Sequence, residues 1–185
     1  MANSLPIMGD KISKEQLMGY KFIGDGADGE VYQLTANTCI KIFYKEETQK
    51  KELEALKLGQ SSNVIPRLYE YGTNYIVMEY VNGISLSKQL KKEKTINQQL
   101  SEKILQMLDE LERIGFTRYD AEVRHILINK NGKLKVIDHK RALSSNQVIP
   151  VKLLKGLRKR KVLEQFLSHV LKLRPELYKK WVQYD

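Results

Sequence analysis

The most constraining feature of this sequence is the stretch 115–142, which contains two aspartates, Asp120 and Asp138. Between them, two apolar runs flank a turn-like segment that ends in Asn131-Gly132. An Asn-Gly pair between such runs predicts a β-hairpin. A hairpin returns the chain to its starting point, so we expect the two aspartates to lie near one another. Paired carboxylates are typical of a divalent-cation site that also moves a proton or a group; two solvated loop aspartates are the alternative.

A glycine-rich segment precedes this stretch, with Gly24, Gly26 and Gly29 in the spacing Gly-x-Gly-x-x-Gly. Two unrelated folds use this spacing. In a dinucleotide-binding domain the third glycine opens a helix. Here β-branched and aromatic residues follow at 31–34 and 39–43, which predicts a strand, a glycine loop and further strands. The exposed N–H groups of such a loop can meet phosphate charge, whereas a glycine-rich hairpin without a ligand is the alternative.

A lysine, Lys41, lies inside one of these apolar strands, where an ammonium group is costly unless it has partners. The pattern of residues 46–58 predicts a helix directly after the strand. Glu52 and Glu54 on this helix are the two candidate partners. We prefer Glu52, because it lies on the side that directs Leu56 toward the core.

The remainder of the chain predicts two strands followed by helices. The strands are expected at 65–69 and 74–81. Helical spacing of apolar residues predicts helices at 96–114, at 150–173 and at 175–181. These elements form an α+β protein with its strands concentrated in the N-terminal part.

Composition indicates an ordinary globular protein of the cytoplasm. No apolar run is long enough for a membrane span, and the N-terminal residues lack the apolar core of a signal peptide. The lone cysteine, Cys39, excludes an internal disulfide framework and fits a buried position in a reducing compartment.

The net charge of +10 is concentrated near the C-terminus, where residues 151–185 hold ten lysines and arginines against three acidic residues. Such a basic region favours a polyanion or an acidic partner, and a solvated helical face is the alternative. The candidate residues are Lys152, Lys155, Arg158, Lys159, Arg160 and Lys161.

The order of these segments resembles that of protein kinases. Arg118-Tyr119-Asp120 stands where that family has His-Arg-Asp, and the segment that begins at Asp138 stands where it has Asp-Phe-Gly. The resemblance covers residues 22–142. Within the family, the chain is similar to minimal atypical kinases. These include the RIO kinases, the small kinase of the tRNA threonylcarbamoylation complex and small bacterial serine/threonine kinases, of which we favour the bacterial group.

The resemblance implies a protein kinase-like two-lobe fold. Its β-rich N-lobe would comprise residues 1–81, and a shortened helical C-lobe without an activation segment would comprise residues 82–185. It also implies ATP, with Mg²⁺ or Mn²⁺, as the cofactor. Asp120 would accept the proton of the acceptor hydroxyl, Asp138 would ligate the metal, and Lys41 would hold the phosphates. The nucleotide-binding residues implied are Gly24, Gly26, Gly29, Val31, Lys41, Glu52, Met78 as gatekeeper, and Glu79 and Val81 through their backbones.

Two departures from the family pattern concern the catalytic loop. Glu122 replaces a lysine that faces the γ-phosphate, and Arg124 is the catalytic residue we expect to substitute for it; Lys140 or Arg141 can also reach. His125 replaces an asparagine that binds the second metal ion. An imidazole ligand favours manganese or zinc over magnesium. Alternatively, His125 packs under the loop and hydrogen-bonds Asp120 or a backbone carbonyl.

Three functions follow from the resemblance and its departures. The first is a small kinase that phosphorylates serine or threonine of an unknown protein substrate, or itself. The second is a pseudokinase, a regulatory module that binds nucleotide without transfer. The third is a kinase that acts on a small molecule.

Overall fold

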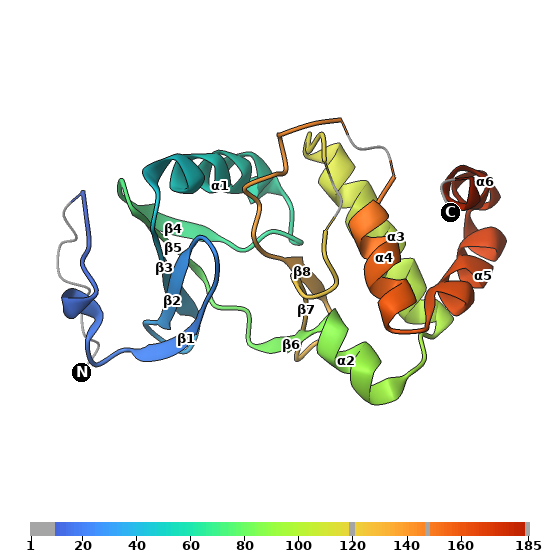
Figure 1. Ribbon diagram of the computed structural model, residues 1–185, viewed down its shortest axis with the longest axis horizontal. Helices are drawn as coiled ribbons and strands as arrows, with labels where there is room; N and C mark the ends of the chain where they lie inside the picture. The colour runs from blue at the N-terminus through green and yellow to red at the C-terminus, as the bar shows by residue number, and fades with distance from the viewer. Residues whose placement is uncertain (1–9, 119–120, 147–148, 184–185) are drawn as a thin grey trace.

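The computed structural model describes residues 10–118, 121–146 and 149–183. Figure 1 shows a β-rich half followed by a largely helical half. A five-stranded antiparallel sheet forms the first half, with strand order β1-β2-β3-β5-β4. Its strands are β1 (Lys21–Asp25), β2 (Gly29–Gln33), β3 (Thr38–Phe43), β4 (Leu68–Tyr71) and β5 (Tyr75–Glu79). A short 3₁₀ helix, η1 (Glu15–Leu17), precedes the sheet.

The predicted succession of strand, glycine loop and strand is confirmed, because β1 and β2 pair in antiparallel fashion on either side of the glycine loop. β2 then pairs with β3, and β3 pairs with β5. The strand predicted at 65–69 begins later, at Leu68, because residues 65–67 lead into β4 without pairing as a strand. The following strand is shorter than predicted and ends at Glu79.

Helix α1 (Glu46–Leu58) packs against the sheet and has the bounds predicted from the sequence. Gln49, Glu52, Ala55 and Leu56 are its buried residues. Their spacing of three or four residues places them on one stripe of the helix. A short 3₁₀ helix, η2 (Gly59–Ser61), follows directly.

The second half is built on a smaller antiparallel sheet of strand order β6-β7-β8. The predicted hairpin is confirmed as β7 (Ile126–Asn129) and β8 (Leu134–Val136). A third strand, β6 (Gly83–Ser85), was not predicted and pairs with β7. Glycine suits this close pairing, because a Cβ atom at Gly83 would lie 2.1 Å from the carbonyl oxygen of Ile128.

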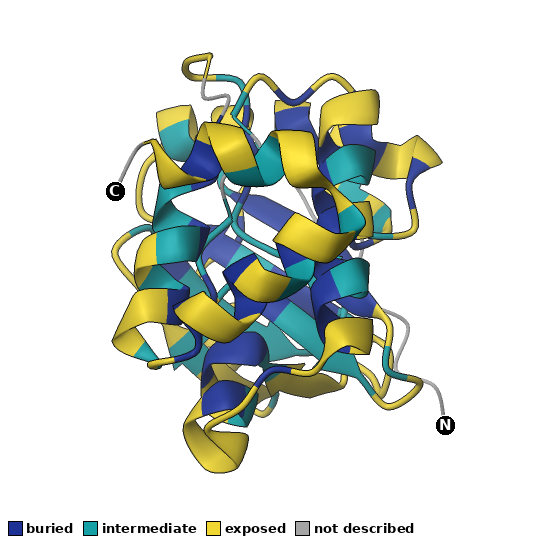
Figure 2. Cartoon of the chain, turned by 90° about the vertical axis from the view of Figure 1, so that its right-hand side faces the viewer, coloured by how far each residue is buried: buried dark blue, intermediate teal, exposed yellow. Residues whose placement is uncertain are grey.

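Helices follow the small sheet, and Figure 2 shows their buried residues turned inward and their exposed residues turned outward. The helix predicted at 96–114 is confirmed as α3, and side-chain oxygens of Ser85 and Asn97 cap the starts of α2 and α3. The helices are α2 (Leu86–Glu93), α3 (Gln98–Arg113), α4 (Val151–Lys159), α5 (Leu163–Leu173) and α6 (Pro175–Val182).

The prediction of one continuous helix at 150–173 was wrong, because the chain breaks between α4 and α5. Lys161 has a left-handed φ of 61°. Its N–H donates to the carbonyl of Arg158, and the N–H of Val162 donates to the carbonyl of Leu157. These two bonds form a Schellman motif, in which an apolar contact between the residues equivalent to Val162 and Leu157 is common. Glycine usually marks such a stop, and here a lysine takes its place.

One hydrophobic core runs through both halves, from Cys39 in β3 to Trp181 in α6. Polar contacts also join the halves. The N–H of Val136 in β8 donates to the carbonyl of Val64 (2.8 Å), and the Lys135 ammonium donates to the carbonyl of Ile65 (3.1 Å). Among the described residues, no helix combines the length and apolar character needed to cross a lipid bilayer.

Candidate active site

A cavity of about 420 Å³ opens between the large sheet and the segments around β7 and β8, a volume within the range of small-molecule sites. Residues from the glycine loop, β3, α1 and the segment after β5 line it. Arg124, His125 and Asp138 line it from the other half. The structure brings every residue predicted to bind the nucleotide to this cavity: Gly24, Gly26, Gly29, Val31, Lys41, Glu52, Met78, Glu79 and Val81.

The three glycines of the loop differ in their surroundings. A Cβ atom at Gly29 would lie 1.8 Å from the carbonyl oxygen of Ile42 in β3, whereas Gly24 and Gly26 have nothing within 4 Å of that position. Gly29 is therefore required by the β2–β3 pairing. Gly24 and Gly26 leave open space at the cavity, which suits a loop that closes over phosphates.

An ion pair between Lys41 of β3 and Glu52 of α1 lies in the cavity wall, with Nζ and Oε2 2.6 Å apart. The two side chains are 11% and 2% exposed, so the pair is largely removed from water. Burial raises the pKa of Glu52, and the Lys41 charge opposes that rise. Of the two predicted partners, Glu52 is the one that contacts Lys41, while Glu54 is exposed.

The end of β5 and the residues directly after it hold Met78, Glu79 and Val81 against the cavity. Backbone bonds fix it, because the Glu79 N–H donates to the carbonyl of Arg67 and the Tyr80 N–H to that of Asn37, both at 2.8 Å. The Glu79 carboxylate accepts from Lys135 at 2.7 Å and is thereby held by β8.

Cys39 also lines the cavity, and burial raises the pKa of its thiol to about 12. The thiol is therefore protonated at neutral pH, as expected of a packing residue.

Asp138 combines two unusual features. Its φ of 64° is left-handed, a conformation that aspartate tolerates better than most residues. Its Oδ1 atom is buried and has no hydrogen-bond partner among the described residues, while Oδ2 lies 3.6 Å from Nε2 of His125. A buried carboxylate oxygen without a partner is costly, and a divalent cation would satisfy it. Asp138 therefore fits the metal-binding role predicted for it.

His125 faces Asp138 as a neutral ring. Burial lowers its pKa, although the Asp138 charge acts in the opposite direction. Its backbone is fixed, since its N–H donates to the carbonyl of Glu122 (2.8 Å) and its carbonyl accepts from Ile137 (2.9 Å). The part of the chain that the structure describes holds no group of three or more potential metal-ligating side chains. Both roles predicted for His125, metal ligand or packing residue, stay predictions.

His139 stands where kinases have phenylalanine, and it is buried against the ring of Phe116, with the ring centroids 5.5 Å apart. Burial lowers its pKa to about 4, so the ring is neutral at physiological pH. An uncharged imidazole thus takes the apolar place of the phenylalanine.

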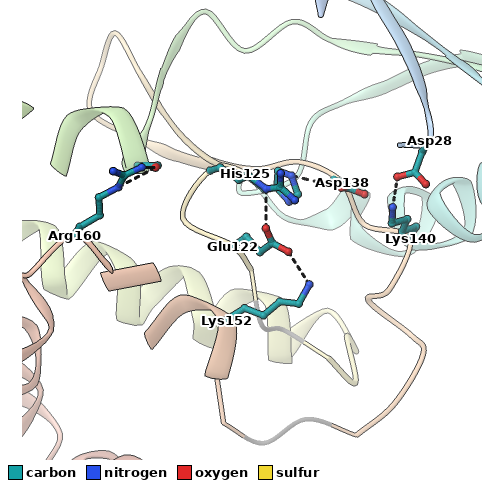
Figure 3. A network of polar contacts seen from close by, with 9 residues as sticks. Asp28, Glu122, His125, Asp138, Lys140, Lys152 and Arg160 are labelled. Carbon is teal, nitrogen blue, oxygen red and sulfur yellow. Dashed lines mark hydrogen bonds and ion pairs between the residues drawn. The ribbon is translucent and has the colours of Figure 1, made fainter. Parts of the chain in front are cut away.

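The predicted catalytic base, Asp120, lies outside the described residues. Two residues further along the chain, Glu122 accepts hydrogen bonds from Lys152 (2.8 Å) and Arg124 (2.7 Å). The bond from Lys152 contributes most to lowering the pKa of Glu122 to about 2. Figure 3 shows Lys152 reaching this loop from α4. Gly156, one turn further along α4, permits the approach, because a Cβ atom there would lie 2.7 Å from Val123.

Sequence reasoning did not place Lys152 or Asp28 in the site. Lys152 was assigned to the basic surface instead. Asp28 of the glycine loop forms an ion pair with Lys140, which follows Asp138 by two residues (Figure 3). These pairs join residues 30 and 112 positions apart, so no local pattern could have indicated them.

A second cavity of about 270 Å³ shares part of its lining with the first. The shared residues are Ala27, Arg124, His125, Ile137, Asp138 and Lys140. A substrate in the smaller cavity would therefore meet a ligand of the larger one at Asp138.

Comparison with known proteins agrees with this arrangement. The model of the ABC1 atypical kinase-like domain matches residues 27–155. The chain is 28% identical over 134 residues to the Bacillus subtilis (strain 168) protein named "Putative serine/threonine-protein kinase YrzF", covering 70% of this chain and 62% of the relative. It is 30% identical over 149 residues to mitogen-activated protein kinase kinase 2 of Arabidopsis thaliana, covering 70% and 41%. The chain thus spans less than two thirds of the length of either relative.

Proposed function

The chain belongs to the ABC1 atypical kinase-like domain family, and from this premise we propose that it is a small ATP-dependent kinase that phosphorylates serine or threonine of a protein. The observation that carries the proposal is the cavity that brings together the Lys41–Glu52 pair from one half and Asp138 from the other, where Asp138 Oδ1 has no hydrogen-bond partner among the described residues. A nucleoside triphosphate with a divalent cation requires a lysine fixed in position to bind its phosphates and a carboxylate that can bind the cation.

Each residue has a defined part in this proposal. Lys41 binds the α- and β-phosphates, and Glu52 keeps its ammonium group in place. Asp138 and His125 would hold Mg²⁺ or Mn²⁺, which when bound offsets the charge of the phosphates. Asp120 orients the acceptor hydroxyl and accepts its proton. Arg124 stays a candidate contact to the transferred group.

We further propose that the chain divides into two lobes, at 1–81 and 82–185, with the nucleotide between them. The break falls after the β5 segment that would contact the adenine edge. The family match and the arrangement of the two sheets support this division.

A nucleotide-binding module without transfer is the second candidate. The observation that favours it is Glu122, a carboxylate at the loop position where kinases carry a lysine, although Lys152 and Arg124 neutralise it here. A small-molecule acceptor in the 270 Å³ cavity is a further alternative. The presence or absence of phosphate transfer separates the module from both kinases.

The test of nucleotide binding is a thermal shift. ATP with Mg²⁺ at a hundred times its Kd should stabilise the protein by about 2.7 kcal/mol. For a chain of this length that corresponds to a rise in melting temperature of roughly 5–10 °C. Lys41→Met and Asp138→Asn should each abolish the rise, measured against the variant's own ligand-free melting temperature.

Lys50→Met is the matched control, because Lys50 is exposed on α1. It should keep the full shift. A wild-type protein that shows no shift at millimolar ATP and metal contradicts the proposal. Incubation with γ-labelled ATP then decides between kinase and module, since only a kinase transfers the label to itself, to an added protein or to a small molecule.

Replacing His125 tests the metal site. A neutral imidazole facing Asp138 favours manganese, so the wild type should bind ATP more tightly with Mn²⁺ than with Mg²⁺. His125→Asn should reduce the Mn²⁺-to-Mg²⁺ preference by about tenfold, a typical effect of altering a metal's surroundings. The measurement is the Kd of ATP in each metal, and an equal loss with both metals would assign His125 to packing.

The basic C-terminal region remains a proposed site for a polyanion or acidic partner. The structure separates the six candidate residues of this region into two that are bonded within the fold and four that are exposed. Lys152 and Arg160 are engaged inside the fold, with Glu122 and Ser87 respectively. The exposed members are Lys155, Arg158, Lys159 and Lys161.

A further inference from the structure

An ion pair closes one side of the nucleotide cavity. Lys140, in the segment after β8, pairs with Asp28 in the glycine loop, and both residues line the cavity. Their side chains are 25% and 19% exposed, so the contact is substantially shielded from water. Figure 3 shows the lysine directed toward the aspartate across the space between the two halves.

Lys140 also lies where the two cavities meet. In a kinase-like site the transferred phosphoryl group must lie between nucleotide and acceptor, and therefore at this junction. The shared lining contains two cations, Arg124 and Lys140. The Arg124 side chain is 67% exposed and is bonded to Glu122. Lys140 is the more shielded of the two and faces the glycine loop.

The backbone around Lys140 is held firmly. His139 is buried against Phe116, the N–H of Ala142 donates to the carbonyl of His139, and the N–H of Arg118 donates to the carbonyl of Ala142, both at 2.9 Å. The glycine loop is less enclosed, because Gly26 and Ala27 are exposed. When the pair separates, the Asp28 side chain rotates toward this exposed part of the loop, while the Asp28 carbonyl still accepts from the Tyr44 N–H (2.9 Å).

We propose that Lys140 recognises the terminal phosphate of ATP, and that Asp28 holds it in position until the triphosphate displaces the aspartate. This inference rests on the proposed function and deepens it. A γ-phosphate carries more negative charge than a carboxylate and offers several acceptor oxygens, so it competes successfully for the ammonium group. ADP lacks this phosphate and leaves the ion pair intact.

Lys140 also has a part in transfer. The acceptor oxygen forms a bond to the γ-phosphorus while the bond from that phosphorus to the β–γ bridging oxygen breaks. The bridging oxygen keeps the electron pair and leaves with ADP, and the hydroxyl proton passes to Asp120. Lys140 keeps its own proton and offsets the charge on the γ-phosphoryl oxygens throughout. Lys140 thus supplies the positive charge that kinases place on the catalytic loop, where this chain has Glu122 instead of a lysine.

The test compares the dissociation constants of ATP, ADP and adenosine at fixed Mg²⁺. Lys140→Met should weaken ATP binding by about tenfold or more, the usual effect of losing one charge-assisted contact, and should change ADP binding by less than about twofold. Asp28→Asn should tighten ATP binding, because it removes the group that competes for Lys140. Adenosine binding should be unchanged in both variants.

Lys155→Met is the charge-matched control, because Lys155 is exposed on α4, and it should leave the ATP-to-ADP ratio unchanged. Equal weakening of ATP and ADP in Lys140→Met, or weaker ATP binding in Asp28→Asn, would assign the pair a structural role only and overturn the inference. If the wild type binds ADP and adenosine without preferring ATP, the inference fails while nucleotide binding stands. If it binds none of the three, the proposed function fails as well.

Discussion

Replacing Gly29 with alanine is expected to destabilise the protein by about 3 kcal/mol or more, at the upper end of overpacking substitutions. The added Cβ atom would lie 1.8 Å from the carbonyl oxygen of Ile42, and 3.0 Å from the Cα atom of Phe43. Both atoms belong to the backbone of β3, so no side-chain rotation can relieve the clash. The strands must separate where Gly29 is paired with Phe43, next to the bond from the Tyr44 N–H to the Asp28 carbonyl.

Urea denaturation of Gly29→Ala and Gly26→Ala measures this effect against a matched control. Gly26 belongs to the same loop and has open space around its Cβ position. We expect its substitution to change the free energy of unfolding by less than about 1 kcal/mol. Equal urea midpoints for the two variants would show that the close approach of β2 to β3 does not exist in solution.

Replacing Glu52 with leucine is expected to destabilise the protein by about 3–5 kcal/mol, because it leaves the Lys41 ammonium group buried without its counter-charge. The two side chains are 11% and 2% exposed, and they contact each other at 2.6 Å. The double variant Lys41→Met/Glu52→Leu removes both charges and keeps the volume similar. Its stability should return to near the wild-type value, since well-packed apolar residues replace buried ion pairs at little cost.

A double-mutant cycle in urea provides the measurement, with Lys41→Met as the fourth corner. A double variant as unstable as Glu52→Leu would mean that poor packing, rather than the unpaired charge, causes the loss. The double variant should also fail to bind ATP despite its recovered stability. Such a result would separate the contribution of the pair to folding from its contribution to function.

Local patterns in the sequence were sufficient for much of the fold. The bounds of α1 and the β7–β8 hairpin followed from periodicity and from the Asn-Gly signal. Glu52 followed from its place on the inner stripe of α1. In each case the residues that decide the structure lie within a few positions of one another.

Other features depend on contacts between distant segments and had no local signal. The break between α4 and α5 uses Lys161 in a left-handed conformation, where a glycine would have been recognisable. Strand β6 is a strand only because β7 lies beside it. In the sequence, Lys152 is indistinguishable from the neighbouring surface lysines. Its contact with Glu122 becomes evident only when the position of α4 against the loop is known.

The contacts between the two halves also bear on how a ligand enters. The β8 backbone donates a hydrogen bond to the carbonyl of Val64, and the Lys135 ammonium group donates to the Ile65 carbonyl and the Glu79 carboxylate. On this side of the cavity, several hydrogen bonds therefore join the two halves. A rigid-body rotation of one half would have to break these bonds together. The β1–β2 hairpin, in contrast, pairs with the rest of the sheet only through β3 in the described chain. We therefore expect any movement that accompanies ligand entry to be largest in this hairpin, where it would also require separation of the Lys140–Asp28 pair.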